Sequence, residues 1–147
     1  MKIVVLKSDH VDLAQALFLY FQKDDGIENP ISAPDEYIEK LLGKDDFHVI
    51  VALKGETVIG GLTAYELPGY KDEQPEMFLF EMGVKEEHRR KGVGTAIIEK
   101  LKEICLNKGI SEMFVDAFAD NSPACGLYES TGGKGENVVE FTYEIEK

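Results

Sequence analysis

One hexapeptide, Arg89-Arg90-Lys91-Gly92-Val93-Gly94, constrains the fold of this chain more than any other feature. It holds the only two arginines of the sequence and stands between a predicted strand, residues 76–84, and a predicted helix, residues 93–109. The helix is indicated by apolar residues that recur at helical spacing and form one face. Glycines let a backbone approach a ligand closely, and the free N–H groups at a helix start attract an anion. The pattern therefore predicts a strand–turn–helix unit that binds phosphate.

The rest of the chain predicts one mixed sheet with helices on its faces, an α/β (α+β) fold in the order β-α-α-β-β-β-α-β-α-β. Strands are expected at residues 2–7, 47–53, 57–65, 76–84, 113–117 and 138–145, and helices at residues 11–21, 34–42, 93–109 and 122–129. Asp9 is the expected N-cap of the first helix, and Lys54-Gly55-Glu56 joins two strands as a hairpin. Because there is no repeat or linker composition, we expect a single domain over residues 1–147.

Charge and composition narrow the partners. The chain has 28 acidic against 16 basic residues, a net charge of −12, which argues against nucleic acid and suits a cationic ligand, although solubility alone also favours acidic surfaces. There is no apolar run of about 18 residues for a membrane span, and Lys7 interrupts the first apolar stretch before a signal peptide could form. Cys105 and Cys125 have no metal-binding spacing with each other or with the scattered histidines, so we expect reduced cysteines, no metal and a cytoplasmic protein.

The glycine turn also resembles that of a known family. It lacks the three-glycine spacing of a dinucleotide-binding fingerprint and the Gly-Lys-Ser/Thr of a Walker turn. Its spacing, Arg89-x-x-Gly92-x-Gly94, resembles the acyl-CoA site of the GCN5-related N-acetyltransferases. Within that family, four segments look like the type I aminoglycoside 3-N-acetyltransferases: Phe47-His48, residues 58–68, residues 87–92 and residues 123–128.

The resemblance implies acetyl-CoA as the co-substrate and assigns residues to its parts. Backbone groups of Met82, Gly83 and Val84 should pair with the pantetheine arm like an added strand. The amides from residue 89 to residue 95 should hold the pyrophosphate, with charge from the arginines: Arg89, Arg90, Lys91, Gly92, Val93, Gly94 and Thr95. Asn121 and Tyr128 should lie near the thioester.

Acetyl transfer to an amine requires a base, donors for the oxyanion and an acid for the leaving thiolate. Glu81, on the fourth predicted strand, and Asp116, at the end of the fifth, are the candidate bases, with Glu66 and Asp120 as outer candidates; any of them could instead be an ordinary surface carboxylate. The N–H of Met82 or Val84 is expected to meet the oxyanion. Tyr128 is the candidate acid for the coenzyme A sulfur, or else a packing residue.

The acceptor is expected to be a cationic amine. Acidic residues cluster in and around the loop that follows the first predicted helix and near the hairpin: Asp24, Asp25, Glu28, Asp35, Glu36, Glu66, Asp72, Glu73 and Glu76. The resemblance implies an aminoglycoside acceptor and hence antibiotic resistance. The alternative acceptors are a polyamine, a peptide N-terminus or another small amine. Alternatively, the protein is a module that binds acetyl-CoA without transferring the acetyl group. A homodimer is common in this fold. One departure is the glycine-rich stretch from Ser130 to Gly135, where relatives commonly have Leu-Gly-Phe.

Overall fold

The computed structural model describes residues 1–146, and contacts within the chain divide it into two units, Met1–Asp116 and Ala117–Lys147. The elements of the first unit are β1 (Lys2–Val5), α1 (Val11–Asp24), α2 (Asp35–Leu42), β2 (Phe47–Lys54), β3 (Thr57–Leu67), β4 (Glu76–Val84), the 3₁₀ turn η1 (Glu86–His88), α3 (Val93–Lys108) and β5 (Met113–Val115). The second unit contains α4 (Ser122–Ser130). Among the described residues, no helix combines the length and the apolar composition that crossing a bilayer requires.

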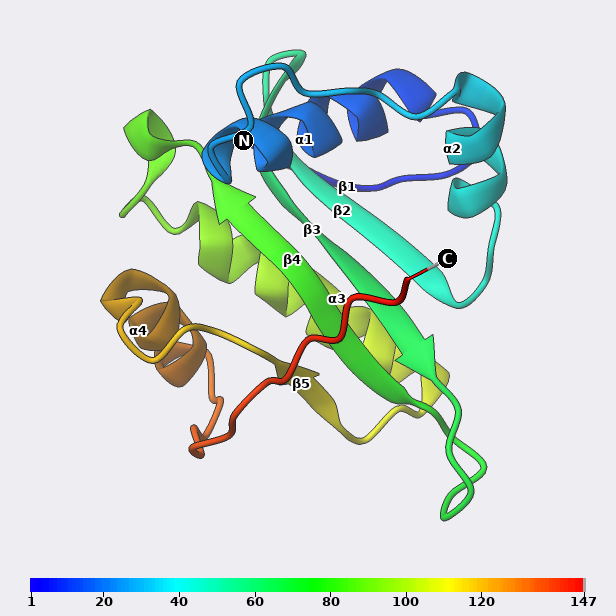
Figure 1. Cartoon of the computed structure of the whole chain (residues 1–147), viewed down its shortest axis with the longest axis vertical. Helices are drawn as coiled ribbons and strands as arrows, with labels where there is room; N and C mark the ends of the chain where they lie inside the picture. The colour runs from blue at the N-terminus through cyan, green and yellow to red at the C-terminus, as the bar shows by residue number, and fades with distance from the viewer. Residues whose placement is uncertain (147) are drawn as a thin grey trace. The chain divides into compact units, whose positions relative to one another are not determined.

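The strands of the first unit form one sheet in the order β1-β2-β3-β4-β5, the order of the chain itself. Neighbours from β1 to β4 are antiparallel, whereas β5 runs parallel to β4 because α3 connects them. The expected β2–β3 hairpin and the mixed sheet are therefore confirmed (Figure 1).

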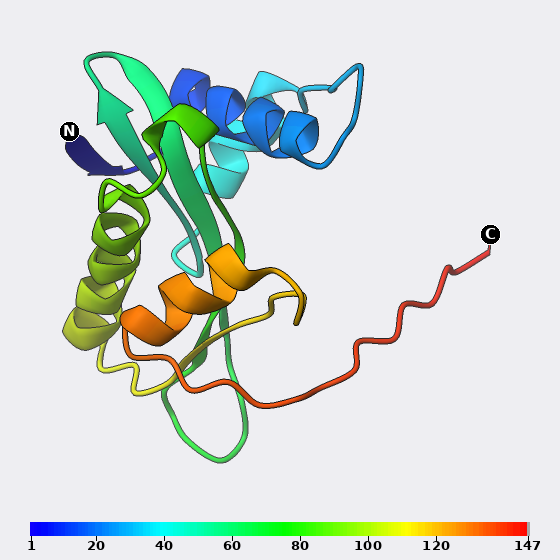
Figure 2. The ribbon, with the colours of Figure 1, turned by 90° about the vertical axis from the view of Figure 1, so that its left-hand side faces the viewer.

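Helices cover both faces of this sheet: α1 and α2 lie on one face and α3 lies on the other (Figures 1 and 2). Strand β2 is buried over Val49–Leu53, as a central strand between two helical layers requires. Alternate residues of the strand point to opposite faces, so Val49 and Val51 pack in the cluster with α1 and α2, and Ile50 and Ala52 point toward α3. The core thus has two layers with β2 and β3 between them.

The predicted C-terminal strand is wrong for this structure: residues 137–146 form neither helix nor strand. The alternation that predicted it is real, but its apolar side chains are between 71 and 85% exposed: Val138, Val139, Phe141, Tyr143 and Ile145. A strand exists only where a neighbouring backbone accepts its hydrogen bonds, and the five-stranded sheet of the described residues does not include this segment.

The predicted N-cap of α1 is also wrong. The helix begins at Val11 with His10 at the N-cap position, and no side chain caps it. His10 Nδ1 instead accepts a hydrogen bond from the N–H of Lys7 at 2.9 Å. This contact ties the residue before the helix to the loop from β1, which leaves Asp9 outside the helix start.

Candidate functional site

The sheet opens between its last two strands. Strand β5 pairs with β4 only over Met77–Leu79, while β4 continues to Val84. From Phe80 to Val84, the edge of β4 that faces away from β3 is paired with no other strand among the described residues. An open strand edge offers unpaired N–H and C=O groups to a ligand that can pair like a strand.

The register of β3 against β4 shows which groups face that open edge. Val84 lies opposite Gly60, and the N–H of the next residue, Lys85, donates to the carbonyl of Ile59 at 2.8 Å. In an antiparallel ladder, residues alternate between pointing their backbone groups at the partner strand and away from it. The groups of Gly83 therefore point toward β3, and those of Met82 and Val84 point to the open edge.

Gly83 lies under the ring of Tyr20, from α1. A Cβ at this position would stand 3.0 Å from Tyr20 Cε2 and 3.1 Å from its hydroxyl oxygen. The absence of a side chain lets α1 approach β4 where the sheet opens. Gly83 therefore contributes through its small size, and the backbone groups of its two neighbours face the open edge.

After β4, the chain passes through η1 into the glycine turn. Arg90 has a φ of 61° and is the one residue other than glycine with a positive φ among residues 1–146; Gly92 has a φ of 81°. Left-handed residues in a turn direct successive N–H groups into one concavity, which suits an anion. A strained conformation at a bulky residue persists where the surrounding structure requires it, often at functional sites.

The start of α3 adds unpaired donors to this turn. The first helical hydrogen bond runs from the N–H of Ala96 to the carbonyl of Gly92 at 3.1 Å, and no side chain caps the helix. The N–H groups of Val93, Gly94 and Thr95 therefore have no acceptor within the helix. Together with the helix dipole, they make the turn a site for negative charge.

The three cations of the turn differ in what they contact. The Arg89 Nε–H donates to the carbonyl of Val84 at 2.7 Å, and its Nη2 lies 3.6 Å from Asp24 Oδ1. Lys91 Nζ donates to the carbonyl of Glu87 at 3.2 Å. Arg90 is exposed and makes no hydrogen bond or ion pair with the residues that the structure describes. The guanidinium of Arg90 is thus the one available to an anion in this arrangement.

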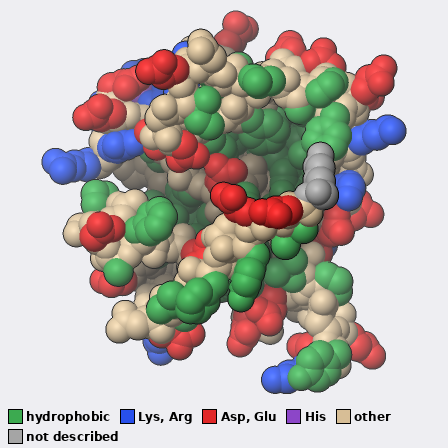
Figure 3. All heavy atoms as spheres, in the orientation of Figure 1, with side chains coloured by type: hydrophobic (Ala, Val, Ile, Leu, Met, Phe, Trp, Pro, Cys, Tyr) green, Lys and Arg blue, Asp and Glu red, His purple; other side chains and the backbone are tan. Residues whose placement is uncertain are grey.

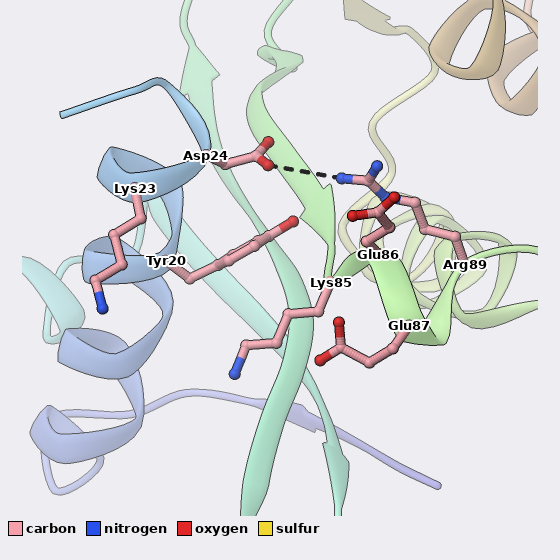
Figure 4. A pocket seen from close by; sticks show the side chains of 7 residues that line it. All are labelled: Tyr20, Lys23, Asp24, Lys85, Glu86, Glu87 and Arg89. Atoms are coloured by element: carbon pink, nitrogen blue, oxygen red, sulfur yellow. Dashed lines mark ion pairs between the residues drawn. The ribbon is translucent and has the colours of Figure 1, made fainter. Parts of the chain in front are cut away.

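A cavity of about 290 Å³ lies beside these groups, between the end of α1 and the segment after β4. Its wall from α1 is made by Tyr20, Lys23 and Asp24, and its opposite wall by Lys85, Glu86, Glu87 and Arg89 (Figure 4). Figure 4 shows the Tyr20 hydroxyl pointing toward the ion pair of Asp24 and Arg89. This hydroxyl is buried beside the Arg89 guanidinium: burial raises the pKa of the phenol, and the nearby guanidinium partly offsets that rise.

Glu81 is placed on the face of the sheet that α1 and α2 cover. It lies opposite Thr63, which in turn lies opposite Val49, and Val49 packs in the cluster with α1. Burial raises the pKa of Glu81 above its ordinary value, and the carboxylate of Asp25, just after α1, raises it further. Glu81 is therefore a half-buried acid whose charge is disfavoured.

Aromatic rings continue across the same face from β3 to β5. Tyr65 meets Phe80 edge to face at 5.5 Å between ring centroids, Phe80 meets Phe78 at 5.6 Å, and Phe78 stacks on Phe114 at 4.6 Å. We call these four residues the aromatic strip. The register shift between Thr63 and Ala64 leaves Phe80 without an opposite residue, and Phe80 is 50% exposed. Glu81 thus borders a partly exposed aromatic surface.

The other predicted site residues are distributed over both units. Asp116 directly follows β5, at the end of the first unit. In the second unit, Asn121 is the N-cap of α4, and its Oδ1 accepts from the N–H of Ala124 at 3.2 Å. Tyr128 is half-buried in α4, and burial raises the pKa of its phenol, with Cys125 adding to the rise.

Glu66, an outer candidate for the base, is engaged elsewhere. It accepts hydrogen bonds from His48, at 2.6 Å, and from Lys108 at the end of α3. Burial pushes the pKa of Glu66 upward, but the hydrogen bonds from Lys108 and His48 outweigh it and hold the pKa below its ordinary value. A carboxylate held ionised by two partners serves the packing of α3 against the hairpin.

In the view of Figure 3, Asp and Glu side chains are more widespread than Lys and Arg, in line with the acidic composition of the chain. Members of the predicted acidic group nevertheless have separate partners. Asp24 pairs with Arg89, Asp35 accepts from Gln15, and Asp72 accepts from the N–H of Gln74 at 3.2 Å. The sequence did not reveal Tyr20 as a site residue, because its helical spacing resembles that of a core residue.

A sequence model of the acetyltransferase (GNAT) family matches residues 12–133. The chain belongs to that family. Its fold is the GNAT fold, and the expected resemblance at the level of the superfamily is confirmed.

Solved structures of this family resemble the chain over its whole length. An aminoglycoside acetyltransferase from an uncultured soil metagenomic sample, in complex with sisomicin, superposes with a TM-score of 0.93 at 29% identity and covers 99% of this chain and 96% of that one. A second aminoglycoside acetyltransferase from an uncultured soil metagenomic sample has a TM-score of 0.91 at 32% identity, over 99% of this chain and 100% of the other.

Curated GNAT relatives act on other amines. The thialysine N-epsilon-acetyltransferase of Bos taurus is 32% identical over 82 residues, which are 55% of this chain and 47% of the relative. The chain spans about half the length of the curated relatives it matches. Membership of the GNAT family therefore does not by itself fix the acceptor.

Proposed function

We propose that this GNAT protein is an acetyl-CoA-dependent N-acetyltransferase that acetylates a cationic small molecule, an aminoglycoside at its 3-N amine. The observation that carries the proposal is the open edge of β4 from Phe80 to Val84, which leads into the uncapped start of α3. Together they offer strand-like pairing for an amide-bearing arm and an anion site for its diphosphate. Acetyl-CoA has both parts in that order.

The coenzyme is bound mainly by the main chain in this proposal. The backbone groups of Met82 and the N–H of Val84 pair with the pantetheine amides, and the turn from Arg89 to Thr95 surrounds the pyrophosphate, where Arg90 and Lys91 add positive charge. Asn121 and Tyr128 are the proposed partners of the thioester group. A main-chain site of this kind tolerates side-chain changes at Gly83 and Val93 only where they leave the backbone in place.

Glu81 is the proposed base. An aliphatic amine with a pKa near 10 is protonated at pH 7, so one proton must leave before the nitrogen can attack the thioester carbonyl. The raised pKa of Glu81 brings its basicity closer to neutral pH, where general bases are most effective. Asp116 is the alternative acceptor of this proton, directly or through water.

The remaining proton transfers involve the strand and α4. As the C–N bond forms, the N–H of Met82 or Val84 donates to the oxygen that becomes negative. When the carbon–sulfur bond breaks, Tyr128 donates its phenolic proton to the sulfur, and its raised pKa keeps that proton in place at neutral pH until then. The nitrogen gives up its second proton as the amide forms, and that proton returns to the Tyr128 phenolate directly or through water. The transfer is direct, because Cys125 has no histidine beside it in the sequence to make it a thiolate.

Binding of a positively charged acceptor is favoured by the net charge of −12 and by the carboxyl groups of Asp25 and Glu81. The aromatic strip adds to this, since aromatic faces attract cations. The aminoglycoside assignment is supported by structural relatives at 29 and 32% identity that are aminoglycoside acetyltransferases. In that role the protein would act in the cytoplasm and confer antibiotic resistance, without a nucleic-acid or membrane partner and without a metal.

A thiol-release assay tests this function. The purified protein is mixed with acetyl-CoA and, in parallel, sisomicin, gentamicin, spermidine, lysine analogues and a short peptide, and the acetylated position is determined by NMR. We expect release with the aminoglycosides and a product acetylated at the 3-amine. Thiol release only with spermidine, lysine analogues or the peptide would reject an aminoglycoside as the acceptor. Acetylation of an aminoglycoside at another amine would reject the 3-N position. A rise in melting temperature with acetyl-CoA but no release on any amine would leave a binding module.

We also propose a homodimer. The apolar residues of the segment 138–145 are exposed, and β5 ends the sheet with an unpaired outer edge among the described residues. In a dimer, this segment of one copy would add as a strand to β5 of the other and bury its alternating apolar side chains.

A further inference from the structure

The side chain of Arg89 does something different from that of Arg90, although the two are neighbours in the glycine turn. Its Nε–H donates to the carbonyl of Val84 at 2.7 Å, and its own N–H donates to the carbonyl of Glu86 at 3.2 Å. Val84 is an open-edge residue of β4, so this carbonyl is one of the few acceptors that the edge offers. The contact therefore occupies part of the edge that we assign to the pantetheine arm.

Asp24 holds the other side of the same guanidinium. It is the last residue of α1, where the helix carbonyls carry partial negative charge and disfavour a carboxylate. Its Oδ1 lies 3.6 Å from Arg89 Nη2, and this is its ion-pair partner (Figure 4). Tyr20 fills the space behind the pair and lies on Gly83 of the same strand.

We infer that Arg89 is a positioning residue that sets the register of the coenzyme arm on β4, and that Asp24 keeps it in that position. This inference rests on the proposed function. A strand edge with repeating donors and acceptors can accept an amide-bearing chain in more than one register. With the Val84 carbonyl already bonded, the arm finds its free partners at Met82 and at the Val84 N–H. That register fixes how far the thioester carbon lies from Glu81.

The inference separates Arg89 from Arg90 in a kinetic experiment. Arg89→Lys keeps the positive charge but loses the planar Nε–H, so we expect kcat to fall about 10- to 100-fold while the dissociation constant for coenzyme A stays within about twofold. Arg90→Ala should do the reverse, with a dissociation constant about tenfold higher, since a charged partner of the phosphate is lost. If Arg89→Lys weakens coenzyme A as much as Arg90→Ala does, and leaves kcat unchanged, Arg89 is a phosphate ligand and the inference is wrong.

Asp24→Asn tests the second half. We expect it to lower kcat about 3- to 10-fold in the wild-type background and to have no further effect in the Arg89→Lys background, because both changes break one bridge. Asp12→Asn, at the exposed start of the same helix, makes the same change in net charge and is the matched control. Full additivity of Asp24→Asn and Arg89→Lys would show that the two residues act independently.

A measurement on the free protein makes the test independent of turnover. Because the chain has only two arginines, its NMR spectrum contains only two arginine Nε–H signals. The Nε–H proton of Arg89 should exchange with water at least about tenfold more slowly than that of Arg90. Asp24→Asn should reduce this difference between the two exchange rates. Equal exchange would overturn the bridge even in an active enzyme. Slow exchange in a protein that does not bind coenzyme A would instead retain the bridge and reject the proposed function.

Discussion

Gly83 offers a sharp test of how the open edge of β4 is built. In Gly83→Ala, the new Cβ would stand 3.0 Å from Tyr20 Cε2, whereas ordinary contacts between such atoms begin near 3.4 Å. Either the ring of Tyr20 or β4 must therefore shift by about 0.4 Å, which is the difference between these distances. Overpacking of this kind costs about 1–3 kcal/mol, and for a chain of this size that corresponds to a melting temperature lower by about 2–12 °C.

Thermal unfolding followed by circular dichroism measures this cost, and calorimetry with coenzyme A measures its effect on the edge. Gly69→Ala is the matched control, since a Cβ there meets nothing within 4 Å. In the double variant Gly83→Ala with Tyr20→Leu, the shorter side chain should remove the clash and recover part of the loss. The packing argument is refuted if Gly83→Ala has the melting temperature of the wild type. It is also refuted if the double variant loses more stability than the two single variants added together.

Four further predictions concern chemistry, stability and assembly. Glu81→Gln should lower kcat/KM about 10²- to 10⁴-fold. Because the base must be ionised and its pKa is raised, wild-type kcat/KM should increase with pH above the ordinary carboxyl range, and a Gln variant that keeps this limb would exclude Glu81. Tyr128→Phe should reduce kcat more than coenzyme affinity in steady-state and calorimetric measurements; equal kcat would leave Tyr128 as a packing residue. Glu66→Gln should cost about 1–3 kcal/mol in urea unfolding at pH 7. Because the pKa of Glu66 is lowered, its contribution to the free energy of unfolding is complete above the ordinary carboxyl pKa and is lost as the pH falls through the lowered value. If Glu66→Gln leaves the pH dependence of unfolding unchanged, the structural role of this carboxylate is contradicted. Truncation after Glu136 should convert a dimer to a monomer in analytical ultracentrifugation. If the truncated protein still sediments as a dimer, the pairing of residues 138–145 with β5 of the other copy is refuted.

The elements around the glycine turn could be predicted from sequence because their signals are local. Strand β4 has the predicted bounds, Glu76–Val84, and α3 begins at Val93 after the glycine that the pattern indicates. Periodicity and turn residues act within a few positions, and both are readable in one segment. The same holds for α4, which was predicted over residues 122–129 and extends over Ser122–Ser130 with Pro123 in its first turn.

Contacts between distant segments were not predictable in the same way. Glu66 appeared to be a candidate base, yet its partner Lys108 is 42 residues away, and only the packing of α3 brings the two together. Arg89 looked like a phosphate ligand, while its ion pair with Asp24 depends on where α1 ends above the sheet. Residues 138–145 alternate as a strand does, but alternation reports an apolar face and says nothing of which backbone lies beside it.

The agreement between strand order and chain order has a consequence for biosynthesis. Each of β2, β3 and β4 pairs with the strand made just before it, so a nascent chain emerging from the ribosome can extend the sheet one strand at a time. Strand β5 comes last, and its parallel pairing with β4 requires the intervening helix α3 to be complete. The edge left open for a ligand is therefore formed by the last strand that can assemble before that helix is released.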